Sequence, residues 1–276
     1  MFDIHTHLYM SQYDDDRAET IKRAFDAGLA MMISVSTSPE DHHKAIAITV
    51  MDKRIFASVG LHPHYFNESL ESTDQLAKDI EELRNLVKDN PKVIAIGECG
   101  LDYFSHTDDA ITDEQKAWQN DGFFAQIRLA QELRLPMIIH CRDAYEDLVE
   151  IIKQEGKDTK FILHCYMGDT EVTKKFLTLP NVYFSFTGNI TYAVKKIAEG
   201  TKDDIRETVK LIPIERMLME TDCPFLAPVP YRGKRNEPSF VVEVAKKIAE
   251  IKNCPESLVE KLCQESLDKV FVLKKI

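Results

Sequence analysis

Six side chains that can bind a metal ion lie within or directly after short apolar runs of this sequence. His5 and His7 are two residues apart in the first run, so both imidazoles would lie on one face of a β-strand. Two imidazoles on one face can bind the same ion. The other four side chains each follow or end a later apolar run, and they are Glu98, His140, His164 and Asp222.

Glu98 directly follows the apolar segment VIAIG at 93–97. A carboxylate at the end of a buried strand is costly to desolvate unless a cation compensates its charge. We therefore interpret Glu98 as a metal ligand in the catalytic centre. Four imidazoles and two carboxylates exceed the three protein ligands typical of one catalytic zinc ion, and they suit a two-metal site with one bridging carboxylate. Glu98 is our candidate for that bridge.

The alternative is a set of buried polar residues that satisfy one another without a metal. Buried histidines and acids each need a partner, and the apolar runs supply too few of them. We therefore expect two divalent ions, either zinc, magnesium or manganese. Nitrogen-rich sites suit zinc, whereas carboxylates in phosphate chemistry also suit magnesium or manganese.

A cysteine directly follows four of the candidate ligands, and a thiolate is an attractive zinc ligand. The four are Cys99, Cys141, Cys165 and Cys223. Along a strand, however, the neighbour of an inward-pointing residue points outward, where cysteine behaves as a small hydrophobic side chain. The alternation therefore predicts a structural role for these cysteines.

Several further polar residues suit a phosphate-containing substrate. In GLHPH, His62 is positioned to contact a substrate oxygen, whereas the role of His64 stays open. Arg142 lies two residues after His140, and the segment YRGKRNEP carries Arg235. The planar donor fork of arginine suits phosphate oxygens, so we expect Arg142 and Arg235 to bind phosphate. A solvated basic loop is the competing interpretation for the second segment.

Eight apolar runs alternate with helical patterns and must position these residues. The runs are 1–5, 31–35, 55–61, 93–97, 137–140, 161–165, 182–186 and 217–220. The helical patterns cover about 16–28, 39–52, 73–89 and 143–154, with others opening at a capping box formed by Thr112 and Gln115 and at Pro238. This rhythm predicts an α/β protein, a (β/α)8 TIM barrel whose functional residues gather at the carboxyl ends of its strands.

Composition limits the classes of protein that the chain can represent. Its 276 residues suit one barrel domain spanning 1–276, and no Gly/Ser-rich linker divides them. The net charge of −11 argues against a surface that coats nucleic acid broadly.

No run is long and apolar enough to span a membrane, and the amino-terminal residues do not resemble a secretory signal, so we expect a cytoplasmic protein. The polar segment 187–210 suits either an active-site loop or solvated surface.

An ordered set of motifs across nearly the whole chain resembles the TatD-type metal-dependent deoxyribonucleases, within the amidohydrolase-like barrel hydrolases of the metallo-dependent hydrolase type. The motifs are FDIHTHL, VGLHPH, AIGECGLDY, HCRDA, HCYMGD, ETDCPFLAP and RNEP. The resemblance implies a DNA substrate contacted locally at a strand end, and 3′–5′ exonuclease activity. It also places the metal ligands at His5, His7, Glu98, His140, His164 and Asp222. HCYMG differs from the family's HCF(S/T)G form, so Met167 affects the expected substrate pocket.

The mechanism that we expect is metal-assisted hydrolysis of a phosphodiester bond by an activated water. Asp222 is the expected general base, because a carboxylate near the ions can accept and later return a proton. His62 and Arg142 would hold the phosphate. No feature of the sequence indicates an obligate protein partner.

Two alternatives differ in class from a nuclease. The first is a binuclear-metal amidohydrolase that acts on a C–N bond or a lactone; in many such enzymes a carboxylated lysine from the fourth strand bridges the metals, and here Glu98 holds that position. The second is a non-catalytic metal-binding scaffold. Assays of the metal-loaded protein on DNA and on amides discriminate among the three.

Overall fold

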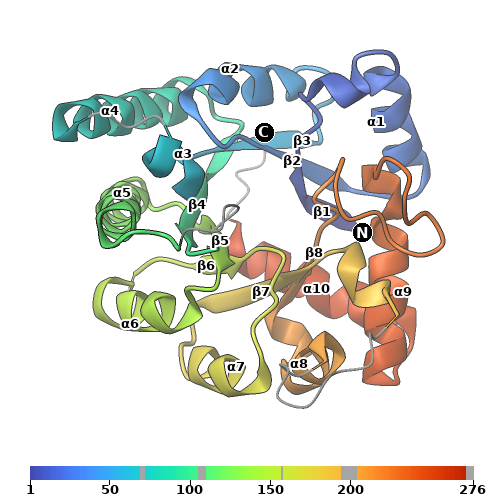
Figure 1. Cartoon of the computed structure of the whole chain (residues 1–276). Helices are drawn as coiled ribbons and strands as arrows, with labels where there is room; N and C mark the ends of the chain where they lie inside the picture. The colour runs from blue at the N-terminus through green and yellow to red at the C-terminus, as the bar shows by residue number, and fades with distance from the viewer. Residues whose placement is uncertain (69–71, 105–109, 157, 194–203, 272–276) are drawn as a thin grey trace.

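The computed structural model describes residues 1–68, 72–104, 110–156, 158–193 and 204–271. Within these residues eight strands form one parallel sheet in the order β1 to β8, with helices around the outside (Figure 1). The strands are β1 Phe2–Thr6, β2 Met31–Val35, β3 Ile55–Val59, β4 Val93–Asp102, β5 Met137–Arg142, β6 Phe161–Leu163, β7 Val182–Phe186 and β8 Met217–Met219. The predicted barrel architecture is confirmed.

Helices follow the strands in the alternation that the sequence predicts. They are α1 Arg17–Asp26, α2 Pro39–Ile48, α3 Pro63–Glu68, α4 Thr73–Asp89, α5 Asp113–Leu133, α6 Tyr145–Glu155, α7 Thr170–Leu177, α8 Ile205–Leu211, α9 Val241–Lys252 and α10 Glu256–Val270. Short 3-10 turns are η1 Ser11–Tyr13, η2 Gly188–Thr191, η3 Ile214–Arg216 and η4 Pro238–Phe240. The sequence patterns did not indicate α3, α7, α8 or α10. No helix among the described residues is both long and apolar enough to cross a membrane.

The barrel closes through residues that follow β8. Thr6 of β1 forms a parallel bridge with Cys223. Around this bridge the amide of His7 donates to the carbonyl of Cys223 (2.9 Å), and the amide of Asp222 donates to the carbonyl of His5 (3.0 Å). The same backbone pairing therefore brings Asp222 beside His5 of β1 and His7, which directly follows β1.

β4 is longer than the sequence pattern predicts. The apolar run ends at Gly97, but the strand continues to Asp102 and pairs with β5 through Gly100–His140 and Asp102–Arg142. Gly97 and Gly100 have φ of 139° and 140°, and a Cβ atom at either position would overlap a carbonyl oxygen of β5. Only glycine tolerates both the backbone conformation and this close approach. Glu98 thus lies within the strand and does not end it.

The cysteines occupy the positions that strand alternation predicts, with one exception. Cys99, Cys141 and Cys223 are buried in the hydrophobic core, and burial raises the pKa of each thiol, so they are neutral at pH 7. Cys165 lies in the turn after β6, is partly exposed and contacts the hydroxyl of Thr187 (3.5 Å). All six cysteines fall within the described residues and are unpaired thiols.

Helix α5 holds two strand ends by its glutamine side chains. The predicted capping box of Thr112 and Gln115 is present at its amino end. Seven residues apart on the helix, Gln119 and Gln126 are fully buried. The amide of Gln119 accepts from the backbone N–H of Asp102 (2.8 Å) and donates to its carbonyl (2.9 Å).

Gln126 makes the same pair of bonds with the segment after β3. Its side chain accepts from the backbone N–H of Leu61 (2.8 Å) and donates to the carbonyl of Leu61 (3.0 Å). We call these two pairs of hydrogen bonds the glutamine clamps. They fix the backbone at Asp102 and at Leu61, the residue before His62. Of the segment 187–210, residues 194–203 lie outside the described residues, while its flanks form η2 and part of α8.

We predict that Gly100→Ala disrupts the β4–β5 contact, because the new Cβ overlaps the carbonyl oxygen of His140. Gly28→Ala is the matched control, since Gly28 also has a positive φ (93°) but nothing within 4 Å of its added Cβ. We expect Gly100→Ala to lower the free energy of unfolding by about 1–3 kcal/mol more than the control. Urea unfolding followed by circular dichroism measures the difference, and equal losses in both variants would contradict this account of β4.

Candidate metal centre

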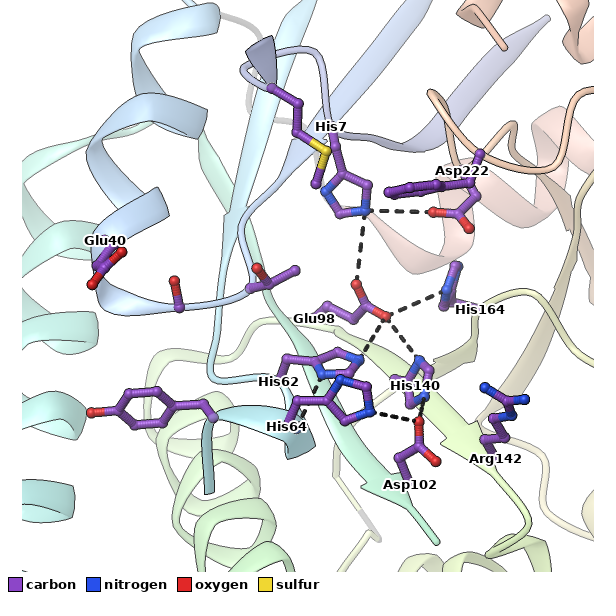
Figure 2. Close-up of a pocket in the computed structure, with 15 residues that line it drawn as sticks. His7, Glu40, His62, His64, Glu98, Asp102, His140, Arg142, His164 and Asp222 are labelled. Carbon is purple, nitrogen blue, oxygen red and sulfur yellow. Dashed lines mark hydrogen bonds and ion pairs between the residues drawn. The ribbon is translucent and has the colours of Figure 1, made fainter. Parts of the chain in front are cut away.

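Glu98 lies at the centre of the polar cluster at the carboxyl ends of the strands (Figure 2). It is 4% exposed, and its two carboxylate oxygens face different groups of side chains. Oε2 is 3.2 Å from Nε2 of His5 and 4.0 Å from Nε2 of His7. Oε1 is 3.0 Å from Nδ1 of His140 and 3.4 Å from Nε2 of His164. One carboxylate therefore joins two sets of nitrogen donors.

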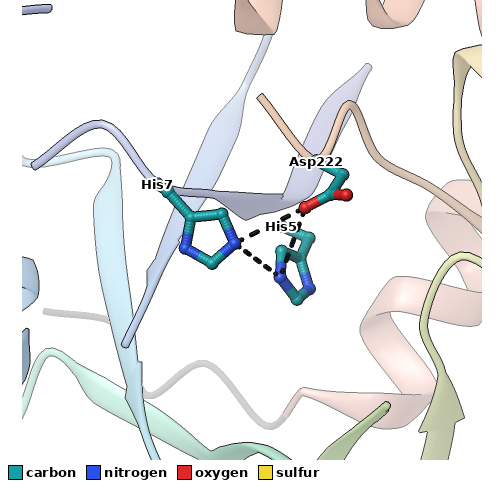
Figure 3. A group of neighbouring side chains, drawn as sticks. All are labelled: His5, His7 and Asp222. Atoms are coloured by element: carbon teal, nitrogen blue, oxygen red, sulfur yellow. Dashed lines mark hydrogen bonds and ion pairs between the residues drawn. The ribbon is translucent and has the colours of Figure 1, made fainter. Parts of the chain in front are cut away.

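The first set is completed by Asp222, whose backbone is fixed by the closing bridge of the barrel (Figure 3). Oδ1 of Asp222 is 3.4 Å from Nε2 of His7 and 3.8 Å from Nε2 of His5. The two Nε2 atoms are themselves 3.2 Å apart. Three potential ligand atoms, from β1, the residue after its end and the segment after β8, thus converge within coordination reach of one another.

Three histidines have their tautomer fixed by a partner on the outer ring nitrogen. Nδ1 of His7 contacts the carbonyl of Val35 (2.9 Å), so it must carry the proton and donate. Nδ1 of His164 faces a carboxylate oxygen of Glu220 (2.8 Å), and Nε2 of His140 faces Oδ2 of Asp102 (3.0 Å). In each ring the nitrogen that faces Glu98 or Asp222 is then the one left for a metal ion, which would take the place of its proton.

His62 has the opposite arrangement. Its Nδ1 accepts from the backbone N–H of His64 (3.2 Å), and a backbone amide can only donate. Burial lowers the pKa of His62 well below its usual value, and the neighbouring His140 lowers it further, so the ring is neutral with its proton on Nε2. Nε2 is 3.5 Å from Oε1 of Glu98. Although His62 groups with Glu98 and His140 by distance, it is a hydrogen-bond donor at this nitrogen.

The pKa shifts of the clustered side chains show that this site favours positive charge. Burial alone raises the pKa of Glu98, but the nearby rings of His164, His5 and His62 lower it by more, so this carboxyl is ionised. Burial lowers the pKa of His164, but the carboxylates of Glu220 and Glu98 raise it by more, to about 10. The carboxylates that hold a proton on His164 would attract a metal cation in the same way. A divalent ion can therefore replace this proton.

The chemistry of the donor set fits divalent ions. Among the described residues, the groups that can hold a metal contain only histidine, aspartate and glutamate. Nδ1 of His5 and the second oxygen of Glu220 are buried and lack a partner within the described part of the chain. His5 instead stacks on the ring of His164, with centroids 3.8 Å apart. Nitrogen and carboxylate ligands of this kind are compatible with zinc and manganese, and the carboxylates with magnesium.

A cavity of about 580 Å³ opens above the cluster. All the expected site residues except His5 and Arg235 line it; His5 is fully buried beneath. The lining residues from the expected set are His7, His62, Glu98, His140, Arg142, His164 and Asp222. The guanidinium of Arg142 lies 3.4 Å from the ring centroid of Phe104, which holds its planar fork at the edge of the cavity.

The expectation that Arg235 binds phosphate is not supported by its position. Its guanidinium forms two short bonds with the carboxylate of Asp16 (2.6 and 2.7 Å) and also donates to the carbonyl of Gln12 (2.6 Å). The sequence places Arg235 in a loop on the catalytic face, but a carboxylate of the α1 amino terminus already occupies its donor fork. Asn236 of the same motif has a structural contact too, since its side-chain amide donates to the carbonyls of Thr221 and Phe225.

Sequence reasoning missed two carboxylates beside the ligands and left His64 open. Asp102 is 1% exposed, and its Oδ2 contacts both His140 and His64 (3.0 and 3.1 Å). Glu220 is fully buried and contacts His164 and the backbone N–H of Cys165 (2.6 Å). Nearness in sequence was the one hint of these residues, and it does not indicate their contacts: Glu220 is two residues before Asp222, and Asp102 is four residues after Glu98.

We predict that Asp102→Ala weakens metal binding by about 10- to 100-fold, because His140 loses the acceptor that fixes its tautomer. Asp102→Asn should recover part of the affinity, since its amide oxygen can still accept one hydrogen bond. The matched control is Asp147→Ala, which removes a nearby carboxylate that accepts from the hydroxyl of Tyr103. Titration of the metal-free protein, with a competing chelator, measures the affinities; equal values for Asp102→Ala and the control would exclude this role.

The chain matches one family model over nearly its whole length and is similar in sequence to several known proteins. A family model described as TatD related DNase matches residues 2–272. An uncharacterized metal-dependent hydrolase, YabD of Bacillus subtilis, is 39% identical, with 98% of each chain covered. A protein named 3′-5′ ssDNA/RNA exonuclease TatD, from Erwinia tasmaniensis, is 32% identical over 90% of this chain and 91% of that one.

Among solved structures, the TatD homologue YJJV of Escherichia coli is similar in fold. It has a TM-score of 0.84 and 24% identity, and the match covers 99% of this chain and 98% of that one. At this identity the likeness concerns the barrel alone.

Proposed function

This chain belongs to the TatD related DNase family of metal-dependent hydrolases, and on that premise we propose that it hydrolyses phosphodiester bonds of DNA from the 3′ end. The observation that carries the proposal is the position of Glu98, whose two oxygens face two separate groups of ligand atoms. A carboxylate in this position is suited to bridge two divalent ions. The name of the Erwinia relative supports the choice of substrate and polarity.

The proposed ligands divide between two ions. His5, His7 and Asp222 would hold one, His140 and His164 would hold the other, and Glu98 would contribute one oxygen to each. Bound divalent cations, whether zinc, magnesium or manganese, would supply Lewis acidity and lower the pKa of water to near neutrality. The positive charge would also attract a phosphate to a chain whose net charge is −11.

The side chains around the cavity perform the remaining steps. Asp222 accepts the proton of the attacking water at its carboxylate and returns it to the 3′ oxygen that leaves phosphorus. His62 donates from Nε2 to a phosphate oxygen, as the tautomer set by its bond to His64 allows. Arg142 pairs its guanidinium with a second phosphate oxygen. These contacts are confined to one phosphate, so the DNA is held locally at a strand end.

We predict that the protein binds two divalent ions per chain and that Glu98→Gln strongly reduces the binding of both. An amide in place of the bridging carboxylate removes the negative charge that both ligand groups share. Elemental analysis of protein dialysed against metal gives the stoichiometry. Glu40→Gln is the control, because Glu40 lines the same cavity but belongs to none of the ligand groups. Full binding by Glu98→Gln, or the loss of one ion only, would contradict the bridging role.

The function itself is tested with single-stranded DNA labelled near its 5′ end. The metal-loaded protein should shorten the strand stepwise from the 3′ end, and a chelator should abolish the reaction. His140→Ala should lower kcat by at least about 100-fold, since it loses a ligand of one ion. A panel of cyclic amides and lactones serves as the competing substrate class. Hydrolysis of the panel without any cleavage of DNA would replace the nuclease assignment with an amidohydrolase.

A further inference from the structure

A second, smaller cavity adjoins the metal centre. Its volume is about 350 Å³, compared with about 580 Å³ for the main cavity. The two cavities share a wall formed by His140, Arg142, His164 and Asp222. The smaller cavity, which we term the side cavity, extends from this wall towards Tyr145, Cys165 and Met167. A group bound at the metal centre can therefore extend a neighbouring moiety into it.

Met167 presents an exposed apolar surface to this side cavity. The residue is 59% exposed, which is unusual for a large apolar residue so close to a cluster of polar side chains. The backbone beneath it is fixed, because the N–H of Met167 donates to the hydroxyl of Tyr145 (3.0 Å). The ring of Tyr145 in turn packs edge-on against the fully buried Tyr166, with centroids 5.3 Å apart. A firmly held loop therefore presents the thioether to an occupant of the cavity.

We propose that the side cavity binds the nucleobase of the 3′-terminal nucleotide, with Met167 packed against the face of the base. This inference rests on the proposed function. A thioether interacts favourably with aromatic rings, and every nucleobase has a π-face, so the contact tolerates any sequence. The scissile phosphate is bonded to the 5′ carbon of the terminal nucleoside. With that phosphate beside Arg142 and His164, its base is adjacent to the cavity that shares those residues.

The sizes of the two cavities assign the terminal base to the smaller one. A volume of about 350 Å³ is at the low end for small-ligand pockets and accommodates a single base, not a base pair. The main cavity is larger and carries Phe225, which is 47% exposed and lies 6.2 Å from the ring of His7. The main cavity therefore suits the part of the DNA strand that lies on the 5′ side of the scissile phosphate. The terminal nucleotide must consequently be unpaired when it binds.

Met167→Ala tests the contact in the metal-loaded protein. Three oligonucleotides serve as substrates: one unmodified, one with an abasic residue at the 3′ terminus and one with an abasic residue at the penultimate position. Met167→Ala should raise KM for the unmodified strand about 2- to 10-fold with little change in kcat, because a methionine–aromatic contact of this size is lost. It should raise KM equally for the penultimate abasic strand. It should leave KM for the terminal abasic strand unchanged.

Met51→Ala is the matched control, since Met51 is 44% exposed and lies between α2 and the amino end of β3, opposite the metal centre. It should behave as the wild type on all three strands. If Met167→Ala raised KM equally for the unmodified and the terminal abasic strands, the proposal would be overturned. It would also be overturned if KM rose for the terminal abasic strand but not for the penultimate abasic strand. If the wild type cleaves none of the three strands, the proposed function fails and this inference fails with it. Cleavage without the selective effect refutes the inference alone.

Discussion

The structure of this site depends on an ionised carboxylate held out of water among imidazoles. Glu98 is 4% exposed and has five histidine rings within 4.0 Å of its oxygens. A buried carboxylate is stable only if its charge is compensated. The backbone around it serves this requirement, since glycines on both sides let β4 approach β5 closely enough for His140 to reach the carboxylate.

Around this carboxylate the molecule adds a second set of contacts that determine which ring nitrogen faces inward. Three rings donate outward, to a backbone carbonyl or to a carboxylate, and leave their inward nitrogen as the one that a metal ion can take from its proton. His62 accepts from the backbone and points a proton inward. The same residue type thereby acts in two ways within one cavity, and the difference comes from the partner on the far side of the ring. The partner on the far side of each ring thus distinguishes the nitrogens proposed to bind the ions from the nitrogen proposed to donate to the substrate.

The barrel and most of the clustered side chains could be predicted from the sequence, because short sequence patterns indicate them. The two-residue spacing of His5 and His7 fixes their common face, and parallel strands bring the ends of distant runs to one edge. The contact of Asp102 with His140 could not be predicted, since it depends on the register by which β4 continues alongside β5 beyond the apolar run. The bond between Arg235 and Asp16 could not be predicted for a similar reason, because the two residues are distant in sequence.

The glutamine clamps of α5 have a consequence for how the site responds to acid. Every ligand of the proposed ions titrates, so protons compete with metals for the same atoms as the pH falls. The amides of Gln119 and Gln126 do not ionise, and the bonds that they make to the backbone of Asp102 and Leu61 are independent of protonation. Loss of metal and loss of loop architecture are therefore separable events. We therefore expect that protein from which mild acid removes the proposed ions keeps these two strand ends in place, and that it binds metal again on neutralisation without refolding.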